Sequence, residues 1–455
     1  MTESPPVHRP DWVNDAVFYQ IFPDRYARSA SASTDVAAWD SAPTRENFLG
    51  GDLRGIVERL DHLVDLGITA VYLTPIFAAG TNHRYDTIDY TRIDPRLGDD
   101  ADFDLLLDNA HRRGIRVVLD AVMHHCGDGH WAFQNVELNG RNSPYADWFV
   151  VDSFPIRTSP ELNYRTCSGC WYLPKLNVDN PALRDHLLGA ARSWTERGID
   201  GWRLDVPYMM ENSGFWRDFR RTVREVNADA YIVAEVWDEP GEWTTGETSD
   251  AAMNYQLRDA LLAFFVDRRT GSTALAERCT TLSADVGDAA GHMLNLLASH
   301  DTARLRTSCG GEPALASSAT GVLLALRGAP MIYYGDEVGL VGFNDPECRG
   351  SMPWDAGDWD CDMLTRIRTF IQLRRDNIAL RRGEQVLQAP HDEVLRIVRT
   401  HPEQTLVVLA NRAGFPVTVP VHRAGRDLIT GSRIAAGVAE IPPRGIIVME
   451  QDHLK

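Results

Sequence analysis

Short apolar segments alternate along the chain with stretches that have the periodicity of amphipathic helices. The apolar segments span residues 17–22, 70–76, 115–122, 199–206, 231–236, 251–255, 293–298 and 331–335. Helical stretches between and after them include 53–66, 102–113, 182–197, 214–227, 256–268, 314–327 and 363–376. Continuous apolar runs of this length are typical of parallel strands that are buried on both faces. Eight such strands alternating with helices predict an α/β fold, the (β/α)8 TIM barrel.

Two regions depart from this alternation. Residues 124–179 are rich in aromatic residues, glycine and proline and show no convincing long helix, and they are far more numerous than a βα loop requires. We interpret them as a subdomain inserted after strand three, above a barrel made of residues 1–123 and 180–382. Residues 383–455 contain short alternating segments separated by proline, glycine and asparagine turns, which predicts a C-terminal β-sandwich.

The charge of the chain excludes several kinds of partner. The 455 residues include 46 Lys and Arg against 64 Asp and Glu, a formal net charge of -18. Nucleic acids and anionic membranes are bound by positive surfaces, so we expect neither as a partner. The first residues, MTESPPVHRPDW, contain no apolar core of a signal peptide and no spanning helix. We therefore expect a cytoplasmic protein.

Seven cysteines are scattered along the chain, an odd number that favours reduced thiols over a disulfide framework. Cys167 and Cys170 form one CxxC pair. A closed zinc site needs four ligands, so a single pair is a weak zinc signal. We interpret these two as ordinary thiols in a loop, with a local disulfide as the alternative.

Three acidic residues lie at the ends of predicted strands: Asp205, Glu235 and Asp301. Because the strands of a parallel barrel end at one face, we expect the three acids to meet there. Arg203 lies two residues before Asp205, on the same side of its strand, and a neighbouring guanidinium lowers the pKa of a carboxyl group. The apolar sequence neighbours of Glu235 favour its protonated form. Such a pair, about 5 Å apart, can cleave a glycosidic bond by double displacement.

Simpler interpretations exist for each residue. A lone Arg-x-Asp pair is more often an ion pair that lines a barrel, and only the acids on two other strands favour catalysis. His125 and His300 also end predicted strands, where they can donate to sugar hydroxyls or serve as hydrogen-bonded structural residues. Tyr85 follows strand two and offers a ring that can stack on a pyranose, although it can equally be a surface aromatic.

Segments at these positions resemble, in order, motifs of the α-amylase family, glycoside hydrolase family 13. They are DAVFYQIFPDRY at 15–26, HRYDTIDY at 83–90, DAVMHHCG at 120–127, GWRLDV at 201–206, AEVW at 234–237, ASHDTAR at 298–304 and PMIYYGDEVG at 330–339. LPKLN at 173–177 and NDPECR at 344–349 resemble markers of the neopullulanase and cyclomaltodextrinase branch.

The resemblance implies a role for each matching residue. Asp205 would be the nucleophile, Glu235 the general acid/base, and Asp301 the carboxylate that binds two hydroxyls of a distorted glucosyl ring. The other residues of the implied sugar site are Tyr85, His125, Arg203, His300, Asp345 and Arg349. Members of this branch cleave α-1,4 bonds, and some also α-1,6 bonds, in cyclodextrins, maltooligosaccharides and pullulan.

The sequence departs from that branch at three points. Strand one begins by Val17, so the additional N-terminal domain that helps branch members to dimerise is not expected, which leaves a monomer or a homodimer formed without it. The residues after GWRLDV are Pro207-Tyr208-Met209 rather than a variant of Ala-Asn-Glu, which leaves the linkage preference open. His124 replaces an asparagine that often binds calcium, and loop 27–39 lacks an Asn/Asp cluster, so we expect no cofactor, metal or required calcium.

The expected function is a retaining α-glucan hydrolase that acts on small maltooligosaccharides or on cyclic oligosaccharides such as cyclodextrins or cyclic maltosyl-maltose. A transglycosylase of the same architecture, in which a sugar replaces water as the acceptor, is the alternative. A sugar-binding protein without catalysis is a third possibility, against which the presence of all three acids argues.

Overall fold

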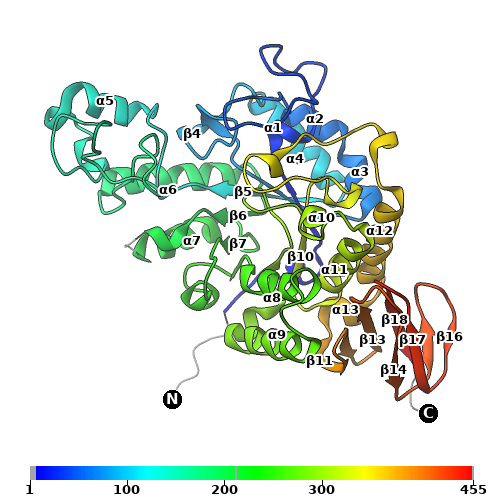
Figure 1. Ribbon diagram of the computed structural model, residues 1–455. Helices are drawn as coiled ribbons and strands as arrows, with labels where there is room; N and C mark the ends of the chain where they lie inside the picture. The colour runs from blue at the N-terminus through cyan, green and yellow to red at the C-terminus, as the bar shows by residue number, and fades with distance from the viewer. Residues whose placement is uncertain (1–6, 211–212, 453–455) are drawn as a thin grey trace, which may run out of the picture.

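A computed structural model describes residues 7–210 and 213–452 of the chain (Figure 1). The strands of the main sheet are β1 (Phe18–Ile21), β2 (Ala70–Leu73), β5 (Arg116–Ala121), β6 (Gly201–Leu204), β7 (Tyr231–Ala234), β8 (Ala251–Ala252), β9 (Leu294–Asn295) and β10 (Ala329–Tyr333). They pair in parallel in the order β8-β7-β6-β5-β2-β1-β10-β9. A parallel bridge between Met253 and Leu294 joins the two ends of this order. The predicted eight-stranded TIM barrel is therefore confirmed.

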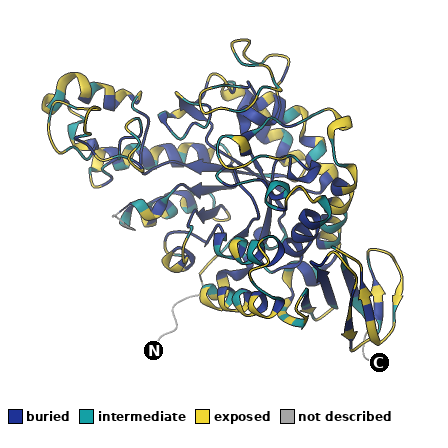
Figure 2. Cartoon of the chain, viewed as in Figure 1, coloured by how far each residue is buried: buried dark blue, intermediate teal, exposed yellow. Residues whose placement is uncertain are grey.

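Burial on both faces explains the continuous apolar sequence of these strands. Every residue of β1, β2, β6, β7 and β10 is buried, as the dark strands at the centre of Figure 2 show. Polar side chains inside the barrel strands, such as Gln20 of β1, Asp120 of β5 and Arg203 of β6, are buried as well. Buried polar groups require partners within the protein. Gln20, Asp120 and Arg203 have their partners in the site described below.

Helices surround the barrel (Figure 1). They are α2 (Leu53–Glu58), α3 (Leu60–Leu66), α4 (Asp100–Arg112), α6 (Pro181–Glu196), α7 (Ser213–Val226), α8 (Tyr255–Phe265), α9 (Ser272–Val286), α11 (Pro313–Ala325) and α12 (Cys361–Asp376), with short helices α1 (Pro23–Tyr26), α10 (Leu305–Ser308) and α13 (Ile378–Arg382). All seven helical stretches expected from the sequence are present. Local signals set their ends: Asp99 and Asp102 form a capping box at the start of α4, and Gly67 ends α3 with a left-handed φ of 93°. Among the described helices, none has the length and apolarity needed to cross a lipid bilayer.

Two insertions cover the carboxyl ends of the strands. A short antiparallel hairpin, β3 (Phe77–Ala79) with β4 (Thr87–Ile93), follows β2 and carries the loop around Tyr85. The long segment after β5 contains helix α5 (Trp131–Asn139), which was not predicted, and it projects from one side of the barrel in Figure 1. This segment returns to the barrel through bridges such as His125 with Lys175.

The C-terminal part consists only of strands. They are β11 (Glu384–His391), β12 (Val394–His401), β13 (Gln404–Asn411), β14 (Val417–Val421), β15 (Gly425–Asp427), β16 (Arg433–Ile434), β17 (Gly437–Ile441) and β18 (Ile446–Gln451). Six of them form one sheet, and β14 pairs with β17 in a second. An apolar cluster that includes Leu409, Val419 and Ile441 joins the two sheets. The all-β C-terminal fold is confirmed, while the domain limits at 124, 180 and 383 stay predictions.

Candidate active site

The first two predicted acids, Asp205 and Glu235, each directly follow the last residue of a strand, and the two strands are neighbours in the barrel. Leu204 of β6 and Ala234 of β7 are register partners, and the next residues are Asp205 and Glu235. The Glu235 amide donates to the Leu204 carbonyl at 3.0 Å, so the pairing continues to the acids themselves. Adjacent strands lie about 4.8 Å apart, which suits the carboxyl separation of about 5 Å that double displacement requires.

One guanidinium binds both acids. Arg203 is 1% exposed, and its Nη1 donates to Asp205 Oδ1 at 2.7 Å while its Nη2 lies 3.0 Å from Glu235 Oε2. Nη1 also donates to the carboxylate of Asp120 at 2.9 and 3.1 Å. Arg203 and Asp205 share one side of their strand, as the spacing predicted. A single buried cation therefore orients three carboxylates, each from a different strand.

Burial dominates the protonation of Asp205. Burial raises the pKa of this carboxyl well above its ordinary value, Arg203 opposes the rise, and the charges of Glu235 and Asp120 add to it. The sequence-based expectation that Arg203 would hold the pKa of Asp205 low is therefore wrong in its net direction. One guanidinium shared among three acids does not outweigh the loss of solvent.

Glu235 has more polar surroundings than its apolar flanks indicated. Its Oε2 accepts the backbone N–H of Val206 at 3.0 Å, and its Oε1 accepts the indole N–H of Trp237 at 3.1 Å. Val206 adopts a left-handed conformation, φ 34° and ψ 48°, which is strained for a β-branched residue. Together with Arg203, these donors fix the direction of the carboxyl group.

His300 occupies the centre of a second hydrogen-bond chain. The Gln20 amide donates to His300 Nδ1 at 2.8 Å, and burial lowers the pKa of this histidine well below its ordinary value. The neutral ring therefore carries its proton on Nε2 and donates to the Tyr85 hydroxyl at 2.7 Å, which in turn donates to Asp120 at 2.9 Å. The rings of Tyr85 and His300 are stacked, with centroids 5.4 Å apart. Tyr85 is thus part of the site rather than a surface aromatic.

The third acid, Asp301, lies in a row of ion pairs at the rim. Its Oδ1 is 3.3 Å from Arg349 Nη2, and its Oδ2 is 3.2 Å from His300 Nε2. Arg349 Nη1 lies 3.0 Å from Asp345, which also accepts from Arg45 at 3.1 Å. Burial raises the pKa of Asp301, and Arg349 opposes that rise. The loops after β9 and β10 are thereby held together over the barrel.

His125 completes the set of predicted residues. Its side chain is 2% exposed, and burial lowers its pKa to about 3, so the ring is neutral near pH 7. Among the described residues its Nε2 has no hydrogen-bond partner, although the backbone of Tyr85 is near. Such a group can bind a hydroxyl of a ligand. All nine residues predicted from the sequence therefore lie at one end of the barrel.

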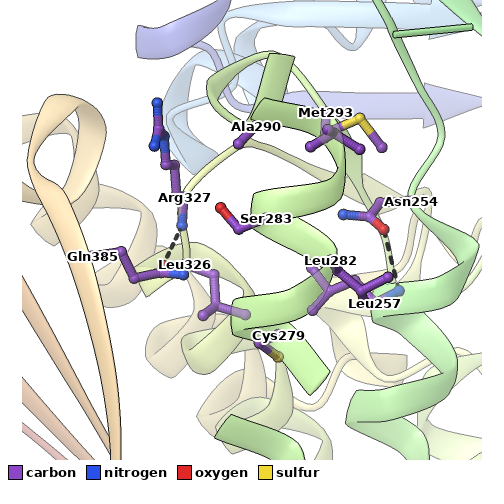
Figure 3. Close-up of a pocket in the computed structure, with 11 residues that line it drawn as sticks. Asn254, Leu257, Cys279, Leu282, Ser283, Ala290, Met293, Leu326, Arg327 and Gln385 are labelled. Carbon is purple, nitrogen blue, oxygen red and sulfur yellow. Dashed lines mark hydrogen bonds between the residues drawn. The ribbon is translucent and has the colours of Figure 1, made fainter. Parts of the chain in front are cut away.

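An open cleft of about 800 Å³ has three of these residues, Tyr85, Asp345 and Arg349, in its wall. Its walls come from the loop after β2, the inserted segment and the loop after β10, and include Tyr85, Trp171, Tyr172 and Arg349. Clefts of this size bind small organic ligands. A separate cavity of about 30 Å³ between α8, α9 and the residues that precede β10 has Leu257, Leu282 and Met293 in its wall and shares no lining residue with the cleft (Figure 3).

Comparison with known proteins identifies the barrel. The model of the α-amylase catalytic domain matches residues 20–382. The chain belongs to the α-amylase family. Residues 394–451 match the model of a β-galactosidase C-terminal domain. A cyclomaltodextrinase of Geobacillus thermopakistaniensis is 42% identical over 96% of this chain and 77% of its own length, and neopullulanase 2 of Thermoactinomyces vulgaris is 40% identical over 93% and 75%.

Solved structures agree with this family assignment. The ligand-free cyclic α-maltosyl-(1→6)-maltose hydrolase of Arthrobacter globiformis has a TM-score of 0.92 and 47% sequence identity, over 98% of this chain and 100% of that one.

Within this α-amylase-family site, sequence reasoning missed Gln20, Tyr72 and the role of Asp120. The Tyr72 hydroxyl donates to Asp120 at 2.6 Å, and Gln20 orients His300. Each is a polar side chain inside an otherwise apolar strand segment, and this was the available signal. The Val206 backbone N–H and the Trp237 indole N–H, which donate to Glu235, had no such signal in the sequence. The turns that follow β6 and β7 bring these two groups to the carboxyl group.

Proposed function

We propose that this chain hydrolyses α-glucosidic bonds in small cyclic α-glucans by retaining double displacement. The observation that carries the proposal is the Arg203 guanidinium, which binds two carboxyl groups from the same level of neighbouring strands. This geometry provides an oriented pair on adjacent strands, and the strand spacing of about 4.8 Å suits the carboxyl separation of retaining enzymes. Membership of the α-amylase family supports α-glucans as the substrate class.

In the proposed first step, Asp205 attacks the anomeric carbon while the bond to the leaving oxygen breaks and Glu235 gives that oxygen its proton. A glycosyl ester on Asp205 results. In the second step Glu235 takes a proton from water, whose oxygen attacks the same carbon and releases the Asp205 carboxylate. Arg203 retains its charge throughout and balances the negative charge that moves between the two acids.

The remaining predicted residues would hold the sugar. Neutral His125 and His300 can exchange hydrogen bonds with hydroxyl groups without adding charge, and Asp301 offers carboxylate oxygens to two hydroxyls. Tyr85 gives the sugar an aromatic surface, and Arg349 with Asp345 limits the cleft at its rim. These roles follow from the family motifs that the residues match.

We propose cyclic maltosyl-(1→6)-maltose as the preferred substrate, before cyclodextrins. The named hydrolase of this compound from A. globiformis is 47% identical over nearly the whole chain, compared with 42% for the cyclomaltodextrinase. Tyr208, 49% exposed, lies within the electrostatic influence of Glu235 and Asp205 and is our candidate for contact with the leaving part of the substrate.

We also propose a cytoplasmic location, because a Bacillus subtilis relative that is 39% identical is named an intracellular maltogenic amylase. We further propose that the enzyme requires no calcium. Among the described residues, one group of three His, Cys, Asp or Glu side chains lies close enough together to hold an ion, and its atoms are nitrogen and sulfur: His124, His125 and Cys167. Calcium requires several oxygen ligands.

The test is a substrate profile. The purified chain is incubated with cyclic maltosyl-maltose, the cyclodextrins, linear maltooligosaccharides and pullulan, and products are separated by chromatography over time. Faster cleavage of the cyclic tetrasaccharide, with maltose as a product, supports the proposal. Faster cleavage of cyclodextrins contradicts the preference, and longer oligosaccharides that appear early at high substrate would favour the transglycosylase.

A further inference from the structure

Three buried side chains at the edge of the catalytic centre form a group with nitrogen and sulfur ligand atoms. One ligand atom each from His124, His125 and Cys167 lies within 4.8 Å of the other two. The Nδ1 atoms of His124 and His125 are 3.2 Å apart. In a tetrahedral zinc site with Zn–N bonds of about 2.0–2.1 Å, two ligating nitrogens are about 3.3 Å apart. At present the two rings share a hydrogen bond at this separation, and a zinc ion bound between them would replace it with little movement of either nitrogen.

The fold holds these groups in place through the backbone. The amide of Leu176 donates to the His124 carbonyl at 3.0 Å, and the amide of Cys126 donates to the Pro174 carbonyl at 3.2 Å. The Cys167 amide donates to the Leu173 carbonyl at 2.9 Å, which closes the turn that carries the thiol. The inserted segment is thereby fastened to the end of β5. Binding an ion would require little ordering of the chain, which favours affinity.

Charges of both signs act on the three side chains. Lys175 lies close enough to His124 to disfavour a second positive charge. Burial raises the pKa of the Cys167 thiol to about 12, and the negative charges of Asp205 and Glu235 add to the rise, so a bound cation has to displace a proton from this sulfur. Cys170, three residues after Cys167, is partly exposed in the cleft wall and does not belong to the group of three.

We propose that His124, His125 and Cys167 bind a soft divalent cation, zinc in the first place, and that the bound ion inhibits the enzyme. Two imidazoles and one thiolate suit zinc, and three protein ligands leave a fourth position open to water. The Cys167 thiol releases its proton to solvent when it binds, and each histidine moves or keeps its proton on Nε2. The sequence, which presents Cys167 only beside Cys170, did not indicate this set.

Inhibition follows from the position of His125. The proposed function assigns this ring to the sugar that is cleaved, and an ion ligated by it occupies space that the substrate needs. Zinc is therefore expected to compete with substrate, which raises the apparent KM and leaves kcat nearly unchanged. This part rests on the proposed function, whereas the binding of the ion does not.

The experiment uses the full-length, metal-free chain and cobalt(II) as a spectroscopic probe for zinc. Wild type should show a sulfur-to-cobalt charge-transfer band that zinc removes. Cys167→Ser should lose the band and raise the inhibition constant for zinc at least about tenfold, with unchanged activity in metal-free buffer. Cys170→Ser is the matched control, since it removes a thiol from the same turn, and it should behave like wild type.

His124→Gln keeps both thiols and serves as a second variant if Cys167→Ser does not fold; it should weaken cobalt binding by a similar factor. The proposal is overturned if wild type shows no band, or if the band survives in Cys167→Ser. Loss of the band in Cys170→Ser would show that Cys170 takes part in cobalt binding, and this result would also overturn the proposal. If the chain shows the cobalt band but hydrolyses none of the tested glucans, the proposed function is refuted. The proposed metal site would stand in that case.

Discussion

Replacing Arg203 with lysine tests whether one guanidinium orients the catalytic pair. Arg203 reaches Asp205 and Glu235 through two different nitrogens, at 2.7 and 3.0 Å, and also binds Asp120. Lysine places its single nitrogen near the position of the guanidinium carbon, about 1.3 Å short of each arginine nitrogen. The contacts then lengthen to about 4 Å, beyond hydrogen-bond distance, unless the ammonium moves toward one acid and away from the other.

The expected magnitude follows from the number of lost bonds. A hydrogen bond to a charged group contributes about 1.5–3 kcal/mol, and lysine can replace at most one of the three carboxylate partners of Arg203. Two lost interactions amount to about 3–6 kcal/mol, divided between folding and the transition state. When most of this lost interaction free energy is lost from the transition state, kcat/KM falls by a factor of about 10² to 10⁴.

Initial-rate kinetics on a substrate that the wild type cleaves, together with thermal unfolding, measure both parts. Arg116→Lys is the matched control, because Arg116 pairs with Asp200 at 2.7 Å elsewhere on the barrel and is 42% exposed. We expect little change in the control, as partly exposed ion pairs contribute little. An Arg203→Lys enzyme with kcat/KM within threefold of wild type and unchanged thermal stability would refute the reasoning.

Three further predictions concern the same site. Val206→Gly should raise the free energy of unfolding by about 1 kcal/mol by relieving the left-handed backbone at φ 34°, and lower thermal stability would contradict this. Because burial raises the pKa of Asp205, the attacking carboxylate is lost as the pH falls, so the acid limb of the kcat/KM profile should lie above the ordinary aspartate value of about 4. A limb at or below that value contradicts the burial argument. Activity should not decrease in chelator, and a loss that calcium restores would show a required calcium ion.

The barrel was predictable because its strands are buried on both faces and are therefore apolar throughout. Even β8, with only Ala251 and Ala252 in the strand, had a weak apolar signal. Helix α9 was not predicted, because the residues on its buried side, such as Leu275 and Cys279, are diluted by alanine, serine and threonine. Strand β11 was missed since its residues are exposed or half-buried and half of them are polar.

The candidate site was predictable to the extent that strand ends and family motifs mark it. The three acids, Arg203 and the two histidines lie near or beyond the carboxyl ends of predicted strands, and the structure brings them together at one end of the barrel. Electrostatic balance was not predictable, because the burial that raises the pKa of Asp205 depends on the whole fold. The proximity of Cys167 to His124 likewise depends on how the inserted segment folds back, for which residue spacing gives no signal.

The most direct test of the proposed mechanism is a trap of its covalent intermediate. Glu235→Gln cannot protonate a leaving sugar and should not turn over natural substrates, but α-maltosyl fluoride needs no such proton to react. Mass spectrometry of the variant after incubation with this fluoride should show one maltosyl group, and peptide mapping should locate it on Asp205. A maltosyl group on another residue, or an unlabelled enzyme that releases inverted maltose, would contradict the account.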